Sequence, residues 1–208
     1  MAAPLVLGPS LAWLTSDRSA VERRLAGAGI ATLPDHRIAL RPGTVRLVER
    51  DAPVDRLVAA EEPVEELLDA ASTGISAVAD LIAVGWATVE LERAIAADPA
   101  GFEVAPDDVL LGAFARRSTR GDRLILLEPN TEGPLVATLA RWGEGPAALY
   151  LSVPGDALPP GSPAGLDVAI RPSVRGGPFG PSILLAGGSS AGPHVVLVNE
   201  PARAAIPR

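Results

Sequence analysis

The chain has 208 residues, a formal net charge of −7 and no cysteine. The acidic balance and the lack of a basic patch argue against a nucleic-acid partner, and the missing cysteines exclude disulfides, thiolate nucleophiles and cysteine-bound metals. Lysine is absent too, which excludes Schiff-base chemistry on a lysine. The apolar N-terminus is short and lacks basic residues, and no apolar run can span a bilayer, so we expect a cytoplasmic protein without a membrane partner.

The first segment of the chain carries a strand, a helix and two more strands. An apolar strand is predicted for residues 11–14, and Ser16 can cap a helix that ends at Gly27 or Gly29. Two strands follow within residues 36–49, because a Pro-Gly pair between two apolar runs predicts a turn. This order of elements predicts a βαβββ-like module.

A helical connector is predicted next. A cluster of glutamates precedes Val64, Leu67 and Ala71, whose spacing matches one face of a helix. A second connecting helix, over residues 134–142, shows similar apolar spacing.

A second copy of the strand and helix pattern follows the connector. It has a strand at residues 84–89, a short helix at 90–94, and strands near 109–113 and 123–129. Its apolar runs have the length expected of buried strands.

A third copy opens with a strand at residues 148–153. The region that follows is rich in proline and glycine, so its helix is predicted to be poor. Apolar strands are then predicted near residues 166–170, 182–185 and 194–201.

The repeated pattern determines the fold class that we predict. A single βαβββ unit cannot close its own core, so such units pair edge to edge and curl into a cup. We predict an α+β protein in which repeated βαβββ modules form a cupped mixed sheet. The predicted division is an N-terminal module at 1–50, a helical connector at 51–83 and paired modules at 84–208. The N-terminal module then packs against the cup or pairs across a dimer.

Two stretches carry a resemblance to a known family. Residues 125–129 read Ile-Leu-Leu-Glu-Pro, and residues 143–150 read Gly-Glu-Gly-Pro-Ala-Ala-Leu-Tyr. They resemble the segment that joins the two halves of the domain in the vicinal oxygen chelate superfamily, most closely in its glyoxalase and methylmalonyl-CoA epimerase branch. There, a strand ending Glu-Leu-Leu-Glu-Pro leads through a helix and Gly-Glu-Gly to a strand opening His-His. The resemblance implies a cup that holds a divalent metal through His and Glu or Gln, with the metal polarising a substrate carbonyl.

The metal ligands of that family are not matched here. In the register that the resemblance implies, three ligand positions fall on Val84, Ile125 and Ala148, which offer no lone pair to a metal. The fourth falls near Asn199, just before Glu200. We therefore predict no metal and no cofactor.

The two strands that would carry the family's histidines suggest a ligand site instead. Side chains two apart on a strand share a face, so two matched sets are expected to face the cup. The predicted ligand-binding residues are Val84, Trp86, Thr88, Ala148, Tyr150 and Ser152. This surface suits a small apolar organic molecule, as the resemblance to the bleomycin-resistance branch also implies. The alternative is that Trp86 and Tyr150 are core side chains that fill the cup.

Two further functions stay open. A metal-dependent lyase, isomerase or dioxygenase of the same superfamily would need ligands from displaced positions, which are His36, Glu49, Glu128 and Glu200. A structural or partner-binding protein would have a filled cup. Members of the family that the chain resembles usually form homodimers, so the resemblance implies a possible homodimer.

The densest basic group also allows two interpretations. It consists of Arg116, Arg117, Arg120 and Arg123. These side chains suit either an anionic ligand such as a CoA ester phosphate or a solvated hairpin.

Overall fold

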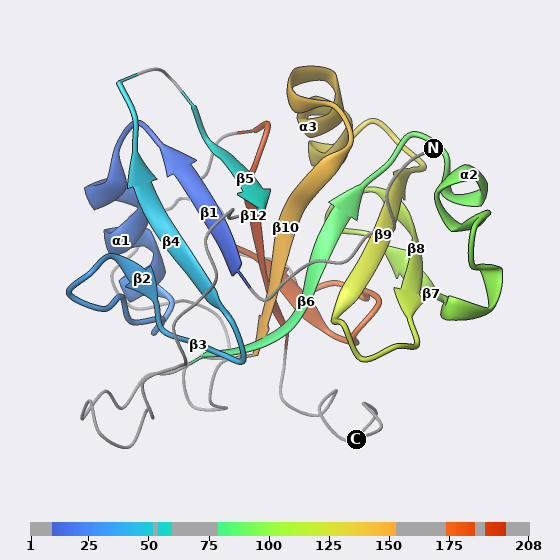
Figure 1. Cartoon of the computed structure of the whole chain (residues 1–208), viewed down its shortest axis with the longest axis horizontal. Coiled ribbons are helices and arrows are strands. Elements are labelled where there is room, and N and C mark those ends of the chain that lie inside the picture. The colour runs from blue at the N-terminus through green and yellow to red at the C-terminus, as the bar shows by residue number, and fades with distance from the viewer. Residues whose placement is uncertain (1–9, 52–53, 60–78, 153–173, 186–189, 199–208) are drawn as a thin grey trace.

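Two β-sheets of unequal size form the protein (Figure 1). The structure is a computed structural model, and it describes residues 10–51, 54–59, 79–152, 174–185 and 190–198. Within that part of the chain, no helix is both long and apolar enough to cross a membrane.

The first sheet has the strand order β2-β4-β1-β5. Its strands are β1 (Ser10–Thr15), β2 (Arg37–Ile38), β4 (Thr44–Glu49) and β5 (Arg56–Ala59). Strand β4 runs parallel to β1, and β5 runs antiparallel to it. The return from β1 to a parallel neighbour needs a crossover, which α1 (Arg18–Gly27) supplies.

The N-cap of helix α1 lies one residue later than predicted. Asp17, not Ser16, caps it, and its side chain accepts a hydrogen bond from the Ala20 backbone N–H at 2.8 Å. Aspartate is as good a cap as serine and adds a negative charge at the positive end of the helix dipole.

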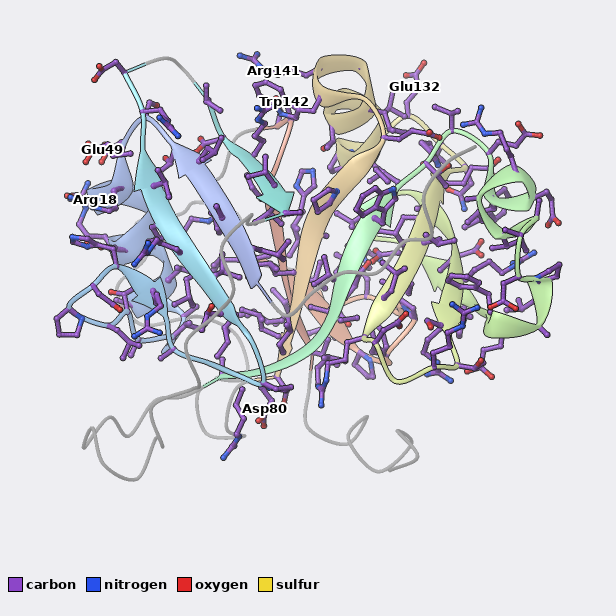
Figure 2. All side chains as sticks on the ribbon, viewed as in Figure 1. Arg18, Glu49, Asp80, Glu132, Arg141 and Trp142 are labelled. Carbon is purple, nitrogen blue, oxygen red and sulfur yellow. The ribbon has the colours of Figure 1, made fainter. Side chains whose placement is uncertain are left out.

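A short strand connects the two sheets. Strand β3 (Leu40–Arg41) follows β2 but pairs in parallel with the start of β6 (Ala79–Ala87), where Leu40 lies opposite Ala79. The Arg41 Nε also donates to the Asp80 carboxylate at 2.9 Å. Asp80 marks this point at the lower edge of the molecule (Figure 2).

The large sheet has the order β11-β12-β10-β6-β9-β8-β7. The second copy is a complete βαβββ unit made of β6, α2 (Leu91–Ile95), β7 (Phe102–Asp108), β8 (Ala113–Ser118) and β9 (Leu124–Pro129), with a short 3₁₀ turn at Pro99–Gly101. Strand β9 returns beside β6 and runs parallel to it, which closes the unit.

The third copy extends the same sheet from its middle. The described part comprises β10 (Gly145–Ser152), β11 (Ser182–Leu184) and β12 (His194–Val198). Strand β10 pairs antiparallel with β6, so the two copies join at one seam. The connecting helix α3 (Pro134–Trp142) has the predicted bounds. The predicted fold class is therefore confirmed: an α+β protein with a cupped mixed sheet of paired units.

The predicted helical connector is wrong at both of its ends. Residues 56–59 form β5, and residues 79–83 belong to β6. Pairing with β1 and β10 outweighs the helical spacing there, because local propensity is weaker than tertiary pairing. The predicted helix over 60–78 and the predicted strand at 166–170 lie outside the described residues. The division of the chain at residues 50 and 83 stays a prediction.

Three buried clusters form the core, and the first of them joins the two sheets. The junction cluster lies between the first sheet, α1 and one face of the large sheet, and it includes Trp13, Leu25, Leu57, Val84, Leu149 and Val195. The inner cluster lies on the opposite face of the large sheet and includes Ala83, Ile125, Leu127, Ala148, Tyr150 and Phe179. A smaller α2 cluster lies under α2 and includes Leu91, Ile95, Leu124 and Leu126. The large sheet is thus buried on both faces near its seam.

The close packing at the seam generates a first prediction. A Cβ added at Gly85 would lie 2.8 Å from Leu127 Cδ1, 3.0 Å from Ala148 Cβ and 3.1 Å from Tyr150 Cε2. We expect Gly85→Ala to lower the free energy of unfolding by roughly 1–3 kcal/mol, the usual cost of overpacking. Urea unfolding of the variant measures this change.

Gly176 provides the matched control, because a Cβ there meets no atom within 4 Å. Gly176→Ala should leave stability unchanged or raise it slightly through the unfolded state. Equal stabilities for the two alanine variants would contradict the packing at the seam.

Candidate functional site

The predicted ligand-binding set does not share one face of the sheet. Ala148 and Tyr150 belong to the inner cluster. Val84 lies in the junction cluster on the opposite face, and Trp86 packs against the α2 cluster. The expected phase of β6 is therefore wrong by one residue: Ala148 pairs with Gly85, so residues 83, 85 and 87 face inward.

The two remaining members of the predicted set have structural neighbours. The Thr88 hydroxyl donates to Glu144 Oε1 at 2.7 Å, across the seam between the two units. Ser152 lies at the end of β10, buried, opposite Asp80 on β6. Neither side chain completes a shared surface with Val84 and Trp86.

One row of inward-facing residues crosses the seam at its centre. Ile125 on β9 lies beside Gly85, Gly85 lies beside Ala148, and Ala148 lies beside His194 on β12. The next row joins Ala83, Tyr150 and Val196. Two of these residues carry polar groups, His194 and Tyr150, and both lie in the third copy.

The Tyr150 hydroxyl forms the most deeply buried polar contact of the site. It donates to Asp108 Oδ2 at 2.5 Å, and the two residues are 0% and 1% exposed. The other oxygen, Asp108 Oδ1, accepts from the backbone N–H groups of Leu110 and Leu111, each at 2.9 Å. Every acceptor oxygen of this buried carboxylate thus has a partner, as burial of a charge requires.

Burial changes the titration of both groups. The pKa of the Asp108 carboxyl is raised by desolvation, against the lowering effect of the Tyr150 hydroxyl and the two N–H donors. The pKa of Tyr150 is raised well above 10, first by burial and then by the charge of Asp108. The phenol is therefore held in its protonated form as a hydrogen-bond donor.

An aromatic contact encloses the tyrosine ring. Phe179 meets Tyr150 edge to face, with ring centroids 5.2 Å apart. Such pairs stabilise cores by about 0.5–1.5 kcal/mol beyond the area that they bury. Together with Leu127, the Tyr150 ring occupies the space above Gly85.

His194 forms a second buried polar pair, with helix α3. Its Nε2 lies 2.9 Å from Thr138 Oγ1, and the Thr138 hydroxyl donates to the Pro134 carbonyl at 3.2 Å. The histidine Nε2–H is thus the donor to the threonine oxygen, since that hydroxyl proton is already used. Burial lowers the pKa of His194 to about 4.

The two seam glutamates that carried the family resemblance have structural contacts. Glu128 Oε2 accepts from the Leu91 backbone N–H at 2.6 Å, at the start of α2. Glu144 Oε1 accepts from the Val89 N–H at 2.9 Å and from Arg93 at 2.7 Å. Bonding to Thr88 and Val89 lowers the pKa of Glu144. Both carboxylates fasten α2 and its preceding turn to the large sheet.

Those displaced metal ligands that the structure describes have other partners and do not gather at one point. His36 Nδ1 lies 2.9 Å from Glu22, and Glu49 pairs with Arg18 at 3.4 Å at the edge of the first sheet (Figure 2). Glu128 is on β9 in the large sheet and contacts the start of α2, and Glu200 lies outside the described residues. Among the residues that the structure describes, no three His, Asp or Glu side chains gather as a metal site would require.

The four arginines of the second copy are engaged with the protein itself. Arg116 pairs with Glu92 at 3.6 Å, and Arg117 pairs with Glu103. Arg120 pairs with Asp98, and Arg123 donates to the Leu81 carbonyl. These contacts favour the hairpin interpretation over an anion site.

Comparisons with known proteins add a distant likeness in structure alone. No family model and no curated protein matches the sequence. A hypothetical protein BH1468 from Bacillus halodurans C-125 is 14% identical, with a TM-score of 0.38 over 59% of this chain and 94% of its own. A Streptomyces coelicolor methylmalonyl-CoA epimerase variant (Q60A), solved in complex with 2-nitronate-propionyl-CoA, is 22% identical, with a TM-score of 0.39 over 57% and 96%. At such low identities and TM-scores, neither family membership nor activity transfers to this chain.

The Tyr150–Asp108 contact generates a second prediction. We expect Tyr150→Phe to lower the free energy of unfolding by about 1–3 kcal/mol, because it leaves Asp108 Oδ2 buried without a donor. Asp108→Asn should cost less, since its amide can still accept from the Leu110 and Leu111 N–H groups and donate to the phenol. Denaturant unfolding of both variants tests the order, and a Tyr150→Phe variant as stable as the parent would contradict it.

The buried histidine generates a third prediction, on acid stability. In the unfolded chain His194 takes up a proton near pH 6.5, but in the folded chain only near pH 4. The stability that neutral His194 contributes is therefore fully present above pH 6.5, and it falls between pH 6.5 and 4 by about 3 kcal/mol at 1.36 kcal/mol per pKa unit. His194→Gln should remove this loss, measured by urea unfolding across the pH range.

The surface residue His36 serves as the control for that experiment. His36→Gln removes the other histidine of the chain and should keep the loss of stability between pH 6.5 and 4. If both glutamine variants retained the same acid loss, His194 would not be its source.

Proposed function

We propose that this chain is a non-catalytic protein of glyoxalase-type architecture, with a filled cup and a structural or partner-binding role. One observation carries the proposal: Tyr150 and Leu127 lie so close above Gly85 that even a Cβ there would approach them to 3.1 and 2.8 Å. The rings and aliphatic side chains of the inner cluster take the room that a substrate would need. A protein with such an interior acts through its surface.

The chemistry of the inward-facing residues supports the same proposal. A divalent metal needs ligands with lone pairs, and Ile125, Gly85 and Ala148 offer none in the central row. Ala83 lies in the neighbouring row, at the place nearest to Tyr150 on β6. These side chains do not fit the metal that the resemblance implies.

A small apolar molecule in the cup is the second candidate, and one observation favours it. The strands that face the inner cluster carry unusually small side chains, which are Ala83, Gly85, Ala87, Ala105, Ala113, Ala115, Ala147 and Ala148. A surface of this kind leaves room for one bulky group, either the protein's own aromatic pair or a ligand that displaces it. The contact of Tyr150 with Asp108 and Phe179 favours the first of these.

The cellular location and the assembly are further proposals from the sequence. We propose a cytoplasmic protein, with a homodimer as the assembly that a partner-binding role would use. Light scattering of the purified chain measures the assembly directly.

Chemical rescue separates the filled cup from the ligand-binding cup. Tyr150→Ala should be about 3–5 kcal/mol less stable and should regain stability with p-cresol, which replaces the missing side chain. The parent protein should show no saturable rise in melting temperature with p-cresol. If Tyr150→Ala does not fold, Phe179→Ala with toluene provides the same comparison.

A saturable stabilisation of the parent protein by p-cresol or toluene would contradict the filled cup and favour ligand binding. Failure of both cavity variants to respond to either compound would also contradict it, because the rings would then not fill a space of their own.

A further inference from the structure

A buried arginine lies at the junction of the two sheets. Arg24, on the face of α1 that packs on the first sheet, is 9% exposed. Its Nη2 donates to the Leu185 carbonyl at 3.2 Å, which ties α1 to the third copy. Its Nε, however, is buried and has no hydrogen-bond partner. An arginine placed in an apolar junction with a free donor is costly, so its position calls for an explanation.

Two more buried polar atoms without partners belong to Trp13, which contacts Arg24, and to Asp55, whose charge acts on Arg24. Trp13 is on β1, and its ring centroid lies 5.8 Å from the Arg24 Cζ, yet the indole Nε1 has no acceptor. The third atom is Asp55 Oδ1, just before β5. Asp55 precedes Leu57 by two residues, and Leu57 pairs with Trp13 on β1.

The electrostatics agree with this proximity. Desolvation lowers the pKa of Arg24, and the charge of Asp55 acts in the opposite direction. The two charges interact electrostatically, but Arg24 Nε and Asp55 Oδ1 each lack a hydrogen bond. Each buried polar atom without a hydrogen-bond partner lowers the stability of the fold by about 1–3 kcal/mol. Native interiors hold few of them, and three in one place indicate a missing partner.

The three atoms define the chemistry of that partner. Arg24 Nε and Trp13 Nε1 are donors, so they need an acceptor oxygen, whereas Asp55 Oδ1 needs an N–H or O–H donor. The arginine and the aspartate balance each other's charge, so a neutral group fits. A carboxylate would place a second negative charge beside Asp55. A primary amide offers both the oxygen and the N–H within one small planar group.

We propose that the junction of the first sheet with the cup is a binding site for a small neutral molecule that presents an amide or hydroxyl group to Arg24, Trp13 and Asp55. The oxygen of that group accepts from Arg24 Nε and Trp13 Nε1, and its N–H or O–H donates to Asp55 Oδ1. The site is separate from the inner cluster, so it does not depend on whether the cup is filled.

Acetamide and acetate are the probes that test this site, because they share one shape and differ in charge and donor. Titration of the ¹⁵N-labelled full chain with each compound is followed by the indole Nε1–H signals of Trp13, Trp86 and Trp142. A Trp13→Phe variant assigns the Trp13 signal. We expect the Trp13 signal to shift saturably with acetamide in the millimolar range and to stay in place with acetate.

The Trp142 indole is the control within the same spectrum. Its Nε1 is also buried without a partner, but it lies on α3, flanked by Arg56 and Arg141 at 5.6 and 5.0 Å from the ring centroid (Figure 2). It should not respond to acetamide. Asp55→Asn should weaken the acetamide response of Trp13 by about tenfold or more, since the acceptor for the amide N–H loses its charge.

Three results would overturn the proposal. The first is no saturable shift of Trp13 with acetamide in the parent protein, as expected if a water molecule alone joins the three atoms. The second is an equal response to acetate, which would contradict the neutral class. The third is an unchanged acetamide response in Asp55→Asn. The first two results are measured on the parent protein, and Trp13→Phe serves only to assign the signal.

Discussion

The buried hydrogen bond between Tyr150 and Asp108 is the contact on which the inner face of the large sheet depends. The strands there carry mostly alanine and glycine, so one bulky side chain must occupy the space between them. Tyrosine does so only if its hydroxyl finds a partner, because an unpaired buried hydroxyl would cancel much of the gain from packing. Asp108 supplies that partner from the end of β7, and the turn at Leu110 and Leu111 holds the carboxylate in place.

The same principle, a carboxylate held by backbone N–H groups, recurs at the seam. Glu128 holds the start of α2, and Glu144 holds the turn before it while bonding Thr88. The Glu128 contact lies within the second copy, whereas the Glu144 contact joins the start of the third copy to the second. The row from Ile125 to His194 follows from the register of the strands. The two glutamates thus hold α2 and the turn that precedes it.

The sequence predicted the large features because their signals are local. Pro134 at the first turn and Gly143 just past the last residue bound α3, and the Pro42-Gly43 pair places the turn before β4. The phase of β6 could not be predicted in the same way. That strand is buried on both faces near the seam, so it reads as a continuous apolar run without alternation.

The main residues of the site could not be predicted from the sequence either, because their roles depend on contacts between distant parts of the chain. Asp108 follows Asp107 in a polar stretch typical of a solvated turn, and its partner Tyr150 lies 42 residues away. Burial of His194 against Thr138 depends on a contact across 56 residues. Orphan atoms such as Arg24 Nε and Asp55 Oδ1 have no sequence signature, since their lack of partners appears only once the two sheets pack.

Alkaline titration of the chain's one tyrosine tests the filled interior most directly, because Tyr150 is the sole source of a phenolate signal. The ultraviolet absorbance of the phenolate is recorded against pH together with circular dichroism. A buried phenol bonded to Asp108 should stay protonated well above pH 10 and ionise only as the protein unfolds. Reversible ionisation near pH 10 in the folded protein would show an accessible ring and contradict the filled interior.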